Sequence, residues 1–288
     1  MKLKSGRLIA GVALASLGTL ASASAYAQSF TPSIDELWIN KNGSEVFRDS
    51  FNGVLPLSTG TYSYSPGFTS ESGGRLTMTP ALGNPTIINP TGTATFTGAL
   101  LKPGLSSTDP GFIGYPDSFE IHALYDMSSL PPINGASFGI RATDQSPSSI
   151  GNDTVQLAVG KSATTGNIVV SLRDINFSLG TSTPISSRSI NSFLASATQV
   201  DLMLAKAAGS DMVGASYVLY GSSGILDQWS FAAQLKIYEG GETFTRAQFF
   251  STTINPVPEP ETYAMLLAGL GLLGFAARGR ELKEAAVA

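Results

Sequence analysis

The feature that most constrains the fold is a period-two alternation of apolar and polar residues, which recurs in short runs along most of the chain. In the run SFEIHALYD, the apolar residues Phe119, Ile121 and Tyr125 alternate with Glu120 and Asp126. Successive side chains of a β-strand point to opposite faces of the sheet. The alternation therefore predicts a strand with one buried face.

Many other runs show the same pattern, and turn-forming residues separate them. The run TQVDLMLAK places Val200, Leu202 and Leu204 on one face. Comparable runs are GRLTMT, TATFTGALL, ASFGIRA, TVQLAVG, NIVVSLRD, GASYVLYG, DQWSFAAQ and RAQFFSTT. Turn signals such as SPGF, NPTG, DPG, PPING and GSSG lie between them. This organisation predicts an all-β antiparallel sandwich, of jelly-roll type, or a barrel. The best short helix candidate is INSFLAS, residues 190–196.

The N-terminus is typical of an export signal. Three basic residues precede an apolar run over residues 8–20, and ASASAYAQ follows with small residues at Ala25 and Ala27. We predict a signal peptide helix over residues 1–27 that signal peptidase removes between Ala27 and Gln28. An uncleaved membrane anchor is the alternative.

Composition narrows the class of protein further. Charged residues make up 13% of the chain and its net charge is −4, against about 25% charged residues in an average soluble domain. No basic stripe is present to neutralise phosphates, so we expect no nucleic-acid partner. The chain has no cysteine. An exported domain without disulfides needs a full-sized hydrophobic core, and thiolate chemistry is excluded.

The C-terminal segment NPVPEPETYAMLLAGLGLLGFAARGR has three ordered parts. Prolines surround an acidic residue, an apolar stretch occupies residues 263–277, and arginines follow. As a helix, that stretch would rise about 22 Å at ~1.5 Å per residue, which is short of the hydrocarbon core of about 30 Å. The basic residues after it predict a cytoplasmic end.

This ending resembles the PEP-CTERM sorting tail of Gram-negative bacteria, whose proteins are processed by a membrane enzyme, the exosortase. The resemblance implies that Pro258, Glu259 and Pro260 are the recognition motif and that Arg278 and Arg280 are the basic stop. It further implies transient anchoring in the inner membrane, followed by location at the cell surface or in a biofilm or exopolysaccharide matrix. An ordinary C-terminal anchor behind a Pro-rich linker is the alternative.

The middle of the chain is similar to the concanavalin-like lectin and glucanase sandwiches. Phe47, Asp49 and Phe51 resemble the opening strand of that family, and Gly74 and Leu76 resemble its second element. The resemblance implies that the final strand, in QLKIYEGGETFTRAQFF, pairs beside the first.

That family includes glucanases, so the acidic side chains of the strands are candidate catalytic residues. Retaining glycosidases use two carboxylates about 5 Å apart, and alternate positions of one strand can supply both. Here only Glu120 fits, because the next positions on that face are His122 and Leu124. We expect no catalytic residues and interpret His122 as filling space on a half-buried strand. The alternative is a carbohydrate-active enzyme with acids from separate strands, such as Glu120 with Asp201 or Asp227.

The acidic residues in loops are the candidate metal ligands. Asp109, Asp144 and Asp153 lie beside turn-forming residues and could offer oxygen ligands to Ca²⁺. Asp117 and Asp211 are similar. None belongs to a known calcium loop, and one histidine cannot form a His-rich site. We therefore expect ordinary turns and no resident metal or cofactor, with Ca²⁺ as the open alternative.

Aromatic residues suggest a different kind of site. Apolar faces of sugar rings pack on aromatic rings, and hydroxyl-bearing side chains complete such contacts. Tyr62, Tyr64 and Trp229 are the candidate carbohydrate contacts, with a place in the core as the alternative for each. The predicted function is a non-enzymatic surface or matrix protein that binds exopolysaccharide. A self-associating adhesin-like module is a weaker alternative.

The predicted organisation follows from these segments. It comprises a signal peptide (1–27), a β-sandwich domain (28–254), a Pro-rich sorting segment (255–262), a transmembrane helix (263–277) and a basic cytoplasmic tail (278–288).

Overall fold

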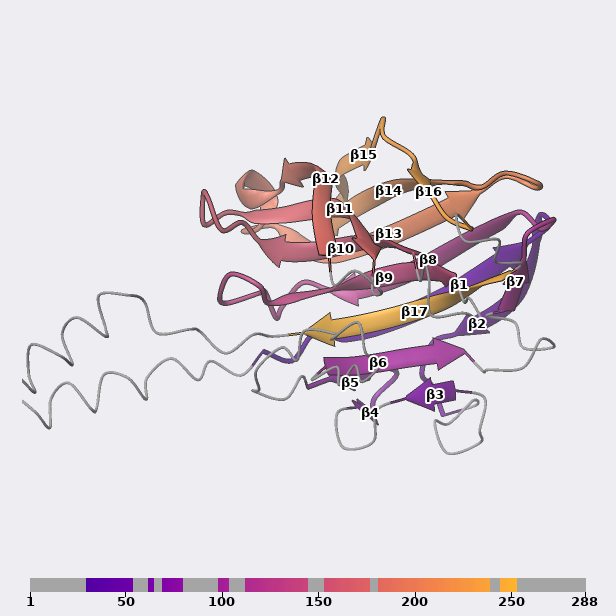
Figure 1. The fold of residues 1–288 in the computed structure, drawn as a ribbon. Helices are drawn as coiled ribbons and strands as arrows, with labels where there is room; N and C mark the ends of the chain where they lie inside the picture. The colour runs from indigo at the N-terminus through magenta and orange to yellow at the C-terminus, as the bar shows by residue number, and fades with distance from the viewer. Residues whose placement is uncertain are drawn as a thin grey trace, which may run out of the picture.

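The computed structural model describes residues 30–53, 62–64, 69–79, 98–103, 112–144, 153–176, 181–238 and 244–252. Within these ranges the chain forms strands and one short 3₁₀ helix, with no α-helix (Figure 1). No helix in those ranges is long and apolar enough to span a membrane. The predicted signal peptide, sorting segment and C-terminal helix lie outside the described residues.

The first antiparallel sheet has nine strands. Its order is β15-β14-β13-β8-β1-β5-β4, with β16 also pairing to β14 and β2 to β1. The strands are β1 (Ser33–Lys41), β2 (Ser44–Asp49), β4 (Thr69–Glu71), β5 (Leu76–Met78), β8 (Phe119–Asp126), β13 (Ala197–Lys206), β14 (Met212–Gly221), β15 (Gly224–Ser230) and β16 (Leu235–Lys236).

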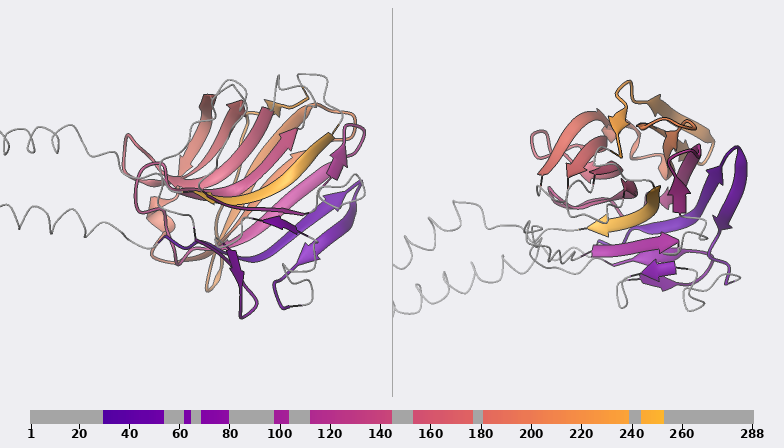
Figure 2. Two further views of the ribbon diagram at one scale, coloured as in Figure 1. Left: turned by 60° about the horizontal axis from the view of Figure 1, so that its bottom comes forward. Right: turned by 45° about the vertical axis from the view of Figure 1, so that its right-hand side comes forward.

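The second antiparallel sheet has eight strands. Its order is β12-β11-β10-β9-β17-β6-β3, with β7 pairing to β17. The strands are β3 (Tyr62–Tyr64), β6 (Gly98–Pro103), β7 (Phe112–Gly114), β9 (Ser137–Asp144), β10 (Asp153–Lys161), β11 (Ile168–Asn176), β12 (Thr181–Ser189) and β17 (Phe244–Thr252). Figure 2 shows the two layers from two further directions.

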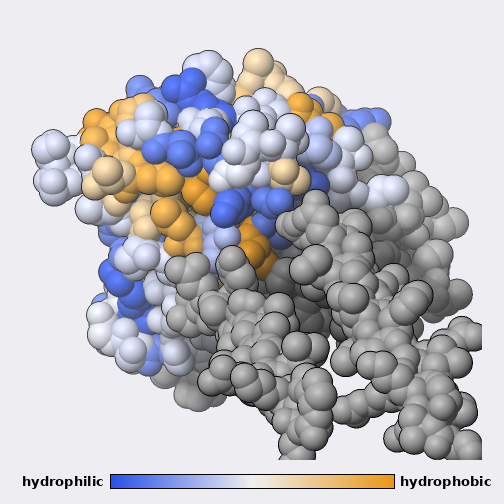
Figure 3. Space-filling view, turned by 90° about the vertical axis from the view of Figure 1, so that its left-hand side faces the viewer, coloured by the Kyte–Doolittle hydropathy of each residue, from blue (hydrophilic) through white to orange (hydrophobic). Residues whose placement is uncertain are grey.

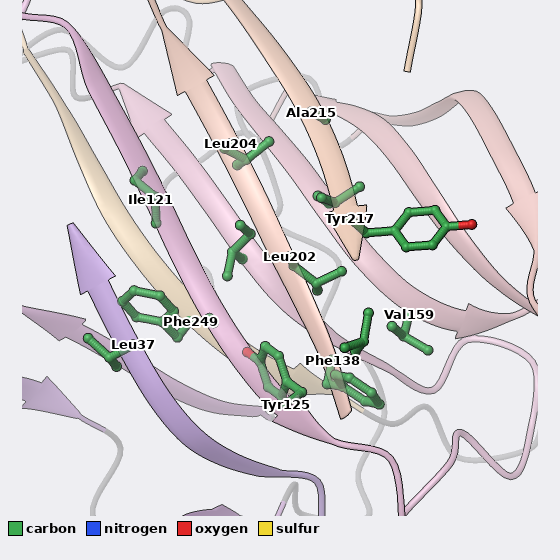
Figure 4. Packing of buried hydrophobic residues seen from close by; sticks show 14 of the residues in the cluster. Leu37, Ile121, Tyr125, Phe138, Val159, Leu202, Leu204, Ala215, Tyr217 and Phe249 are labelled. Carbon is green, nitrogen blue, oxygen red and sulfur yellow. The ribbon is translucent and has the colours of Figure 1, made fainter. Parts of the chain in front are cut away.

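One hydrophobic core lies between the layers. Buried side chains from β1, β8, β13 and β14 meet buried side chains from β9, β10 and β17 (Figure 4). The alternation predicted for β8 is confirmed, because Phe119, Ile121, Ala123 and Tyr125 are buried while Glu120 is exposed. An all-β domain with two antiparallel sheets is therefore confirmed.

A hydrogen bond and a ring contact join the layers directly. The hydroxyl of Tyr125 on β8 donates to the backbone carbonyl of Gly139 on β9 at 2.6 Å. The rings of Tyr125 and Phe138 lie 4.7 Å apart between centroids. Because Tyr125 is fully buried, its hydroxyl needs such an acceptor.

One expectation from the lectin resemblance is wrong. The final strand β17 pairs with β9, β6 and β7, whereas β1 and β2 belong to the other sheet. Alternation fixes which residues of β17 are buried, but it carries no information about the neighbouring strand. The pairing partner could therefore not be read from the local pattern.

The predicted short helix is reduced to a single 3₁₀ turn, η3 (Asn191–Phe193), between β12 and β13. Phe193 and Leu194 pack partly buried against the core.

Figure 3 shows hydrophobic side chains gathered beside strongly polar ones at one end of the molecule.

A buried lysine joins the end of β13 to the connection between β7 and β8. Lys206, 3% exposed at the end of β13, donates to the backbone carbonyls of Tyr115, Asp117 and Ala207 at 2.9, 2.7 and 3.2 Å. The rings of Tyr115, Phe119 and Tyr238 lie 5.6–5.9 Å from its Nζ. These contacts hold the β7–β8 connection against β13.

We expect Lys206→Met to lower the free energy of unfolding by about 2–3 kcal/mol, because three carbonyls lose a charged donor that is itself buried. Urea denaturation followed by circular dichroism measures this. The control is Lys41→Met, whose Nζ lies 2.9 Å from an Asp117 oxygen but is partly exposed; a change below about 1 kcal/mol is expected there. Equal effects of the two substitutions would contradict the assignment.

Candidate functional site

The terminal strands of the two sheets lie beside each other along one side of the domain. β12 ends the eight-stranded sheet and β15 ends the nine-stranded sheet, and both lie at the top of Figure 1. Among the described residues, five large hydrophobic side chains are strongly exposed, and Ile185, Ile225 and Trp229 on these two strands are three of them. Exposed apolar residues that gather beside polar ones are typical of binding surfaces.

An arginine from β12 joins the two edges. Arg188 pairs in register with Val170, a core residue, so its side chain is on the inner side of the sheet. Its Nη2 donates to Asp227 Oδ1 at 2.9 Å, and its Nε donates to Asp227 Oδ2 at 3.1 Å. The Tyr217 hydroxyl also donates to Asp227 Oδ2, at 2.6 Å. We call Arg188, Tyr217, Asp227 and Trp229 the edge site.

The ring of Trp229 forms the open part of the edge site. The Arg188 guanidinium lies over one face, with Cζ 4.2 Å from the ring centroid, and Trp229 is still 44% exposed. Within the described part of the chain, the Nη1 group of Arg188 donates to no acceptor. The site thus offers an aromatic surface next to hydrogen-bond donors, an arrangement that suits a sugar ring.

The charges of the edge site balance each other. Burial opposes ionisation of Asp227, but the hydrogen bonds from Arg188 and Tyr217 outweigh it and lower the pKa of Asp227 below its usual value. The bond to Asp227 raises the pKa of Arg188. Burial and the bond to Asp227 raise the pKa of Tyr217. A lowered carboxyl pKa means that the pair is lost only as pH falls through that pKa, so at neutral pH it is intact.

The other two aromatic candidates lie far from Trp229 in the fold. Tyr62 and Tyr64 belong to β3, the opposite end of the eight-stranded sheet from β12. Tyr64 pairs with Leu101, which pairs with the core residue Phe249. The structure therefore does not bring the three candidates together, and a role for the two tyrosines stays a prediction.

The single histidine belongs to a ladder on the outer face of the nine-stranded sheet. The ring of His122 stacks on Trp38 with centroids 4.3 Å apart and planes 12° apart. Its Nδ1 lies 3.2 Å from an Asp201 oxygen, and Arg48 lies over the Trp38 ring at 5.0 Å. These contacts join β2, β1, β8 and β13. His122 is partly buried, as predicted, but it packs on the outer face.

The acids of the enzyme alternative are far apart. Glu120 pairs with Ala205, four residues along β13 from Asp201, which corresponds to about 13 Å at roughly 3.3 Å per residue. This separation exceeds the 5–10 Å range of glycosidase carboxylates. Asp227 is held by Arg188 at the sheet edge. Asp227 pairs in register with the buried Leu219 and so lies on the inner side of the sheet, whereas Glu120 and Asp201 lie on its outer face.

The loop acids were the candidates for calcium. Asp144 ends β9 and Asp153 begins β10, and their neighbours Thr143 and Thr154 pair in register. Asp109 lies outside the described residues. Within the described ranges, no group of three or more acidic or histidine side chains is placed to hold a metal ion. Calcium binding stays an untested alternative.

Two other loop acids, Asp117 and Asp211, already have hydrogen-bond or ion-pair partners. Asp117 accepts hydrogen bonds from the backbone of Gly114 and the side chain of Asn42, and it pairs with Lys41. Asp211 lies 3.6 Å from Lys236. Asp117 closes a turn, because its N–H also donates to the Gly114 carbonyl at 3.1 Å. A role of either acid in calcium binding stays untested.

The C-terminal tail lies outside the described residues, and comparison with known families addresses it. A model of the PEP-CTERM protein-sorting motif matches residues 256–280. This match contains the predicted recognition motif Pro258, Glu259 and Pro260 and the basic stop Arg278 and Arg280. It indicates an exported protein that an exosortase sorts. A search of curated proteins found no match to the chain.

The sequence analysis did not predict Arg188 or Tyr217 as site residues. Arg188 stands in the run TSTPISSRS, which has no other charged residue, and a lone charge in a Ser/Thr-rich strand was the available signal. Its partner Asp227 lies 39 positions later in sequence. Nothing local indicates that the two strands become neighbouring edges.

Proposed function

We propose that this chain is a non-enzymatic protein of the cell surface or biofilm matrix that binds exopolysaccharide through the edge site. The jelly-roll, concanavalin-like type of sandwich is part of this proposal, as are removal of the signal peptide and a transient helix over residues 263–277 in the inner membrane. The sorting motif supports the location. The observation that carries the binding proposal is the exposed Trp229 beside Arg188 and Asp227.

The side chains of the edge site are better suited to binding a saccharide than to catalysing a reaction. The Trp229 ring provides an apolar surface, and Arg188 provides directed N–H donors for hydroxyl oxygens. Asp227 accepts hydrogen bonds from Arg188 and Tyr217 and is ionised at neutral pH, so it holds no proton to give to a leaving group. Because Arg188 on β12 is bound to Asp227 on β15, its N–H donors are fixed in position before a ligand binds. This limits the conformational entropy that is lost on binding.

We expect Trp229→Ala to weaken binding of a neutral glucan about tenfold, or about 1.4 kcal/mol. Affinity electrophoresis of the purified protein in gels containing dextran measures the effect. The matched control is Trp38→Phe, which alters the other tryptophan, held between Arg48 and His122. We expect that control to retain full affinity. Unchanged migration of Trp229→Ala, or equal loss in both variants, would rule out the edge site.

A further inference from the structure

Strand β12 is a long sheet edge that is open to solvent (Figure 1). Among the described strands it pairs only with β11. It has nine residues, whereas the other strands that end the two sheets have seven in β15 and three in β3 and β4. Residues 181–185 are all exposed, and so are Ser187 and Ser189. The backbone N–H and C=O groups along the free side of such a strand are able to pair with another strand.

The side chains of β12 offer little resistance to such pairing. Arg188 is the only charged residue of the strand, and Asp227 on β15 holds its guanidinium on the inner side of the sheet. Thr181, Thr183 and Ile185 are β-branched, which favours extended strands. Ile185 is also 41% exposed. Two copies of this edge would therefore meet without like-charge repulsion.

The other open strands of more than three residues carry charges. Edge strands usually avoid pairing with a second molecule through charged side chains, proline or bulges. β2, which pairs only with β1 among the described strands, carries the exposed Glu45 and Arg48. β15 carries Asp227 and has a register shift of its own opposite β14. β12 lacks such outward charges, and it is the one of these three strands that contains a proline.

Two features interrupt the free edge of β12 near its middle. Pro184 has no N–H group, and the pairing with β11 continues on both sides of it. Proline is tolerated in a sheet where its nitrogen faces away from the neighbouring strand, so the missing donor lies on the open side. Leu172 and Arg173 of β11 pair with Ser186 and Pro184, which leaves Ile185 as an extra residue. Such a bulge bends the strand and increases its twist.

We propose that Pro184 and the bulge at Ile185 prevent β12 from pairing with β12 of a second copy of this chain. A two-fold axis would place the two edges antiparallel and join the two eight-stranded sheets into one. Because Pro184 lies next to the middle of the strand, it would meet the partner in any register that pairs most of β12. The inference goes beyond the proposed function and does not depend on it.

The test is size-exclusion chromatography with light scattering, run on the purified protein over a series of dilutions. The key variant is Pro184→Thr, which restores the donor and favours a strand. Pro184→Ala is the second variant, because it restores the N–H group with less added bulk. The matched control is Ser187→Thr, which favours a strand at another exposed position of β12 but retains the proline. Thermal unfolding by circular dichroism checks that each variant folds.

We expect the average mass of Pro184→Thr at high concentration to be about twice that of the unmodified protein, and to fall on dilution. Pro184→Ala should change in the same direction, whereas Ser187→Thr should match the unmodified protein. Adding Ser187→Lys to Pro184→Thr places a charge on the edge and should restore the original mass.

Unchanged mass in both proline variants would overturn the proposal, and so would a larger species that Ser187→Lys does not reduce. Arg188 and Trp229 are present in all of these variants. Loss of dextran binding by Trp229→Ala without a change of mass would therefore report on the edge site alone.

Discussion

Replacing Pro258, Glu259 and Pro260 together by alanine is expected to abolish release of the protein from the inner membrane. These residues are the predicted recognition triplet, and they lie within the matched sorting motif. Prolines hold the backbone extended and remove N–H donors, which keeps the segment available to a processing enzyme. Without recognition, the apolar stretch at residues 263–277 should stay in the membrane. Cell fractionation with immunoblotting would show the unprocessed form enriched at least tenfold in the membrane fraction.

The control for this experiment is the pair of substitutions Val257→Ala and Thr262→Ala, which flank the triplet. Both variants should be released like the unmodified protein, and the intact mass of the released form should lack the apolar tail. Normal release of the triple-alanine variant would contradict exosortase sorting. Release of a form that still carries residues 263–277 would contradict it equally.

The substitution with the largest expected effect on stability is Gly139→Ala. Gly139 pairs with Ala158 across β9 and β10. A Cβ at Gly139 would overlap the Leu157 carbonyl oxygen and lie 2.7 Å from Ala158 Cα. Backbone atoms of a central strand cannot move aside without breaking the ladder, so we expect a loss of about 3 kcal/mol or more. Urea denaturation measures this loss, and failure to fold would be its extreme form.

Gly160→Ala provides the matched control on β10. A Cβ there would meet Ala136 O and Ser137 Cβ at 3.5 Å, which is ordinary contact. Alanine also reduces the freedom of the unfolded chain, so we expect no loss and a gain of up to about 1 kcal/mol. A Gly139→Ala variant as stable as Gly160→Ala would show that β9 and β10 do not approach as described.

Local pattern predicts much of this fold because burial in a strand has a period of two. The buried faces of β8 and β13 follow directly from that alternation. β10 is different: Thr154, Gln156 and Ala158 are buried as well as Val155, Leu157 and Val159. The residues on its outer face therefore looked solvent-exposed in the sequence. The period-two pattern therefore could not predict that both faces of β10 are buried.

The sites depend on contacts between distant parts of the chain. His122 and Asp201 are 79 positions apart, and Arg188 and Asp227 are 39 apart. The order of the strands in the sheets determines which of these residues become neighbours. The sequence of a single strand does not indicate which strand will lie beside it. Trp229 was predicted as a sugar contact from its residue type alone, whereas its exposure and its arginine partner came from the structure. The sorting tail needed no fold, because its signal is a linear motif.

The most direct test of the central claim is sedimentation of the purified protein with the exopolysaccharide of its own host. Released reducing sugar is assayed in the same tubes, with and without a calcium chelator. A non-enzymatic polysaccharide-binding protein should sediment with the polymer and release no sugar, and Trp229→Ala should sediment less. Sugar release, or a protein that stays in the supernatant with its polymer in excess, would contradict the account.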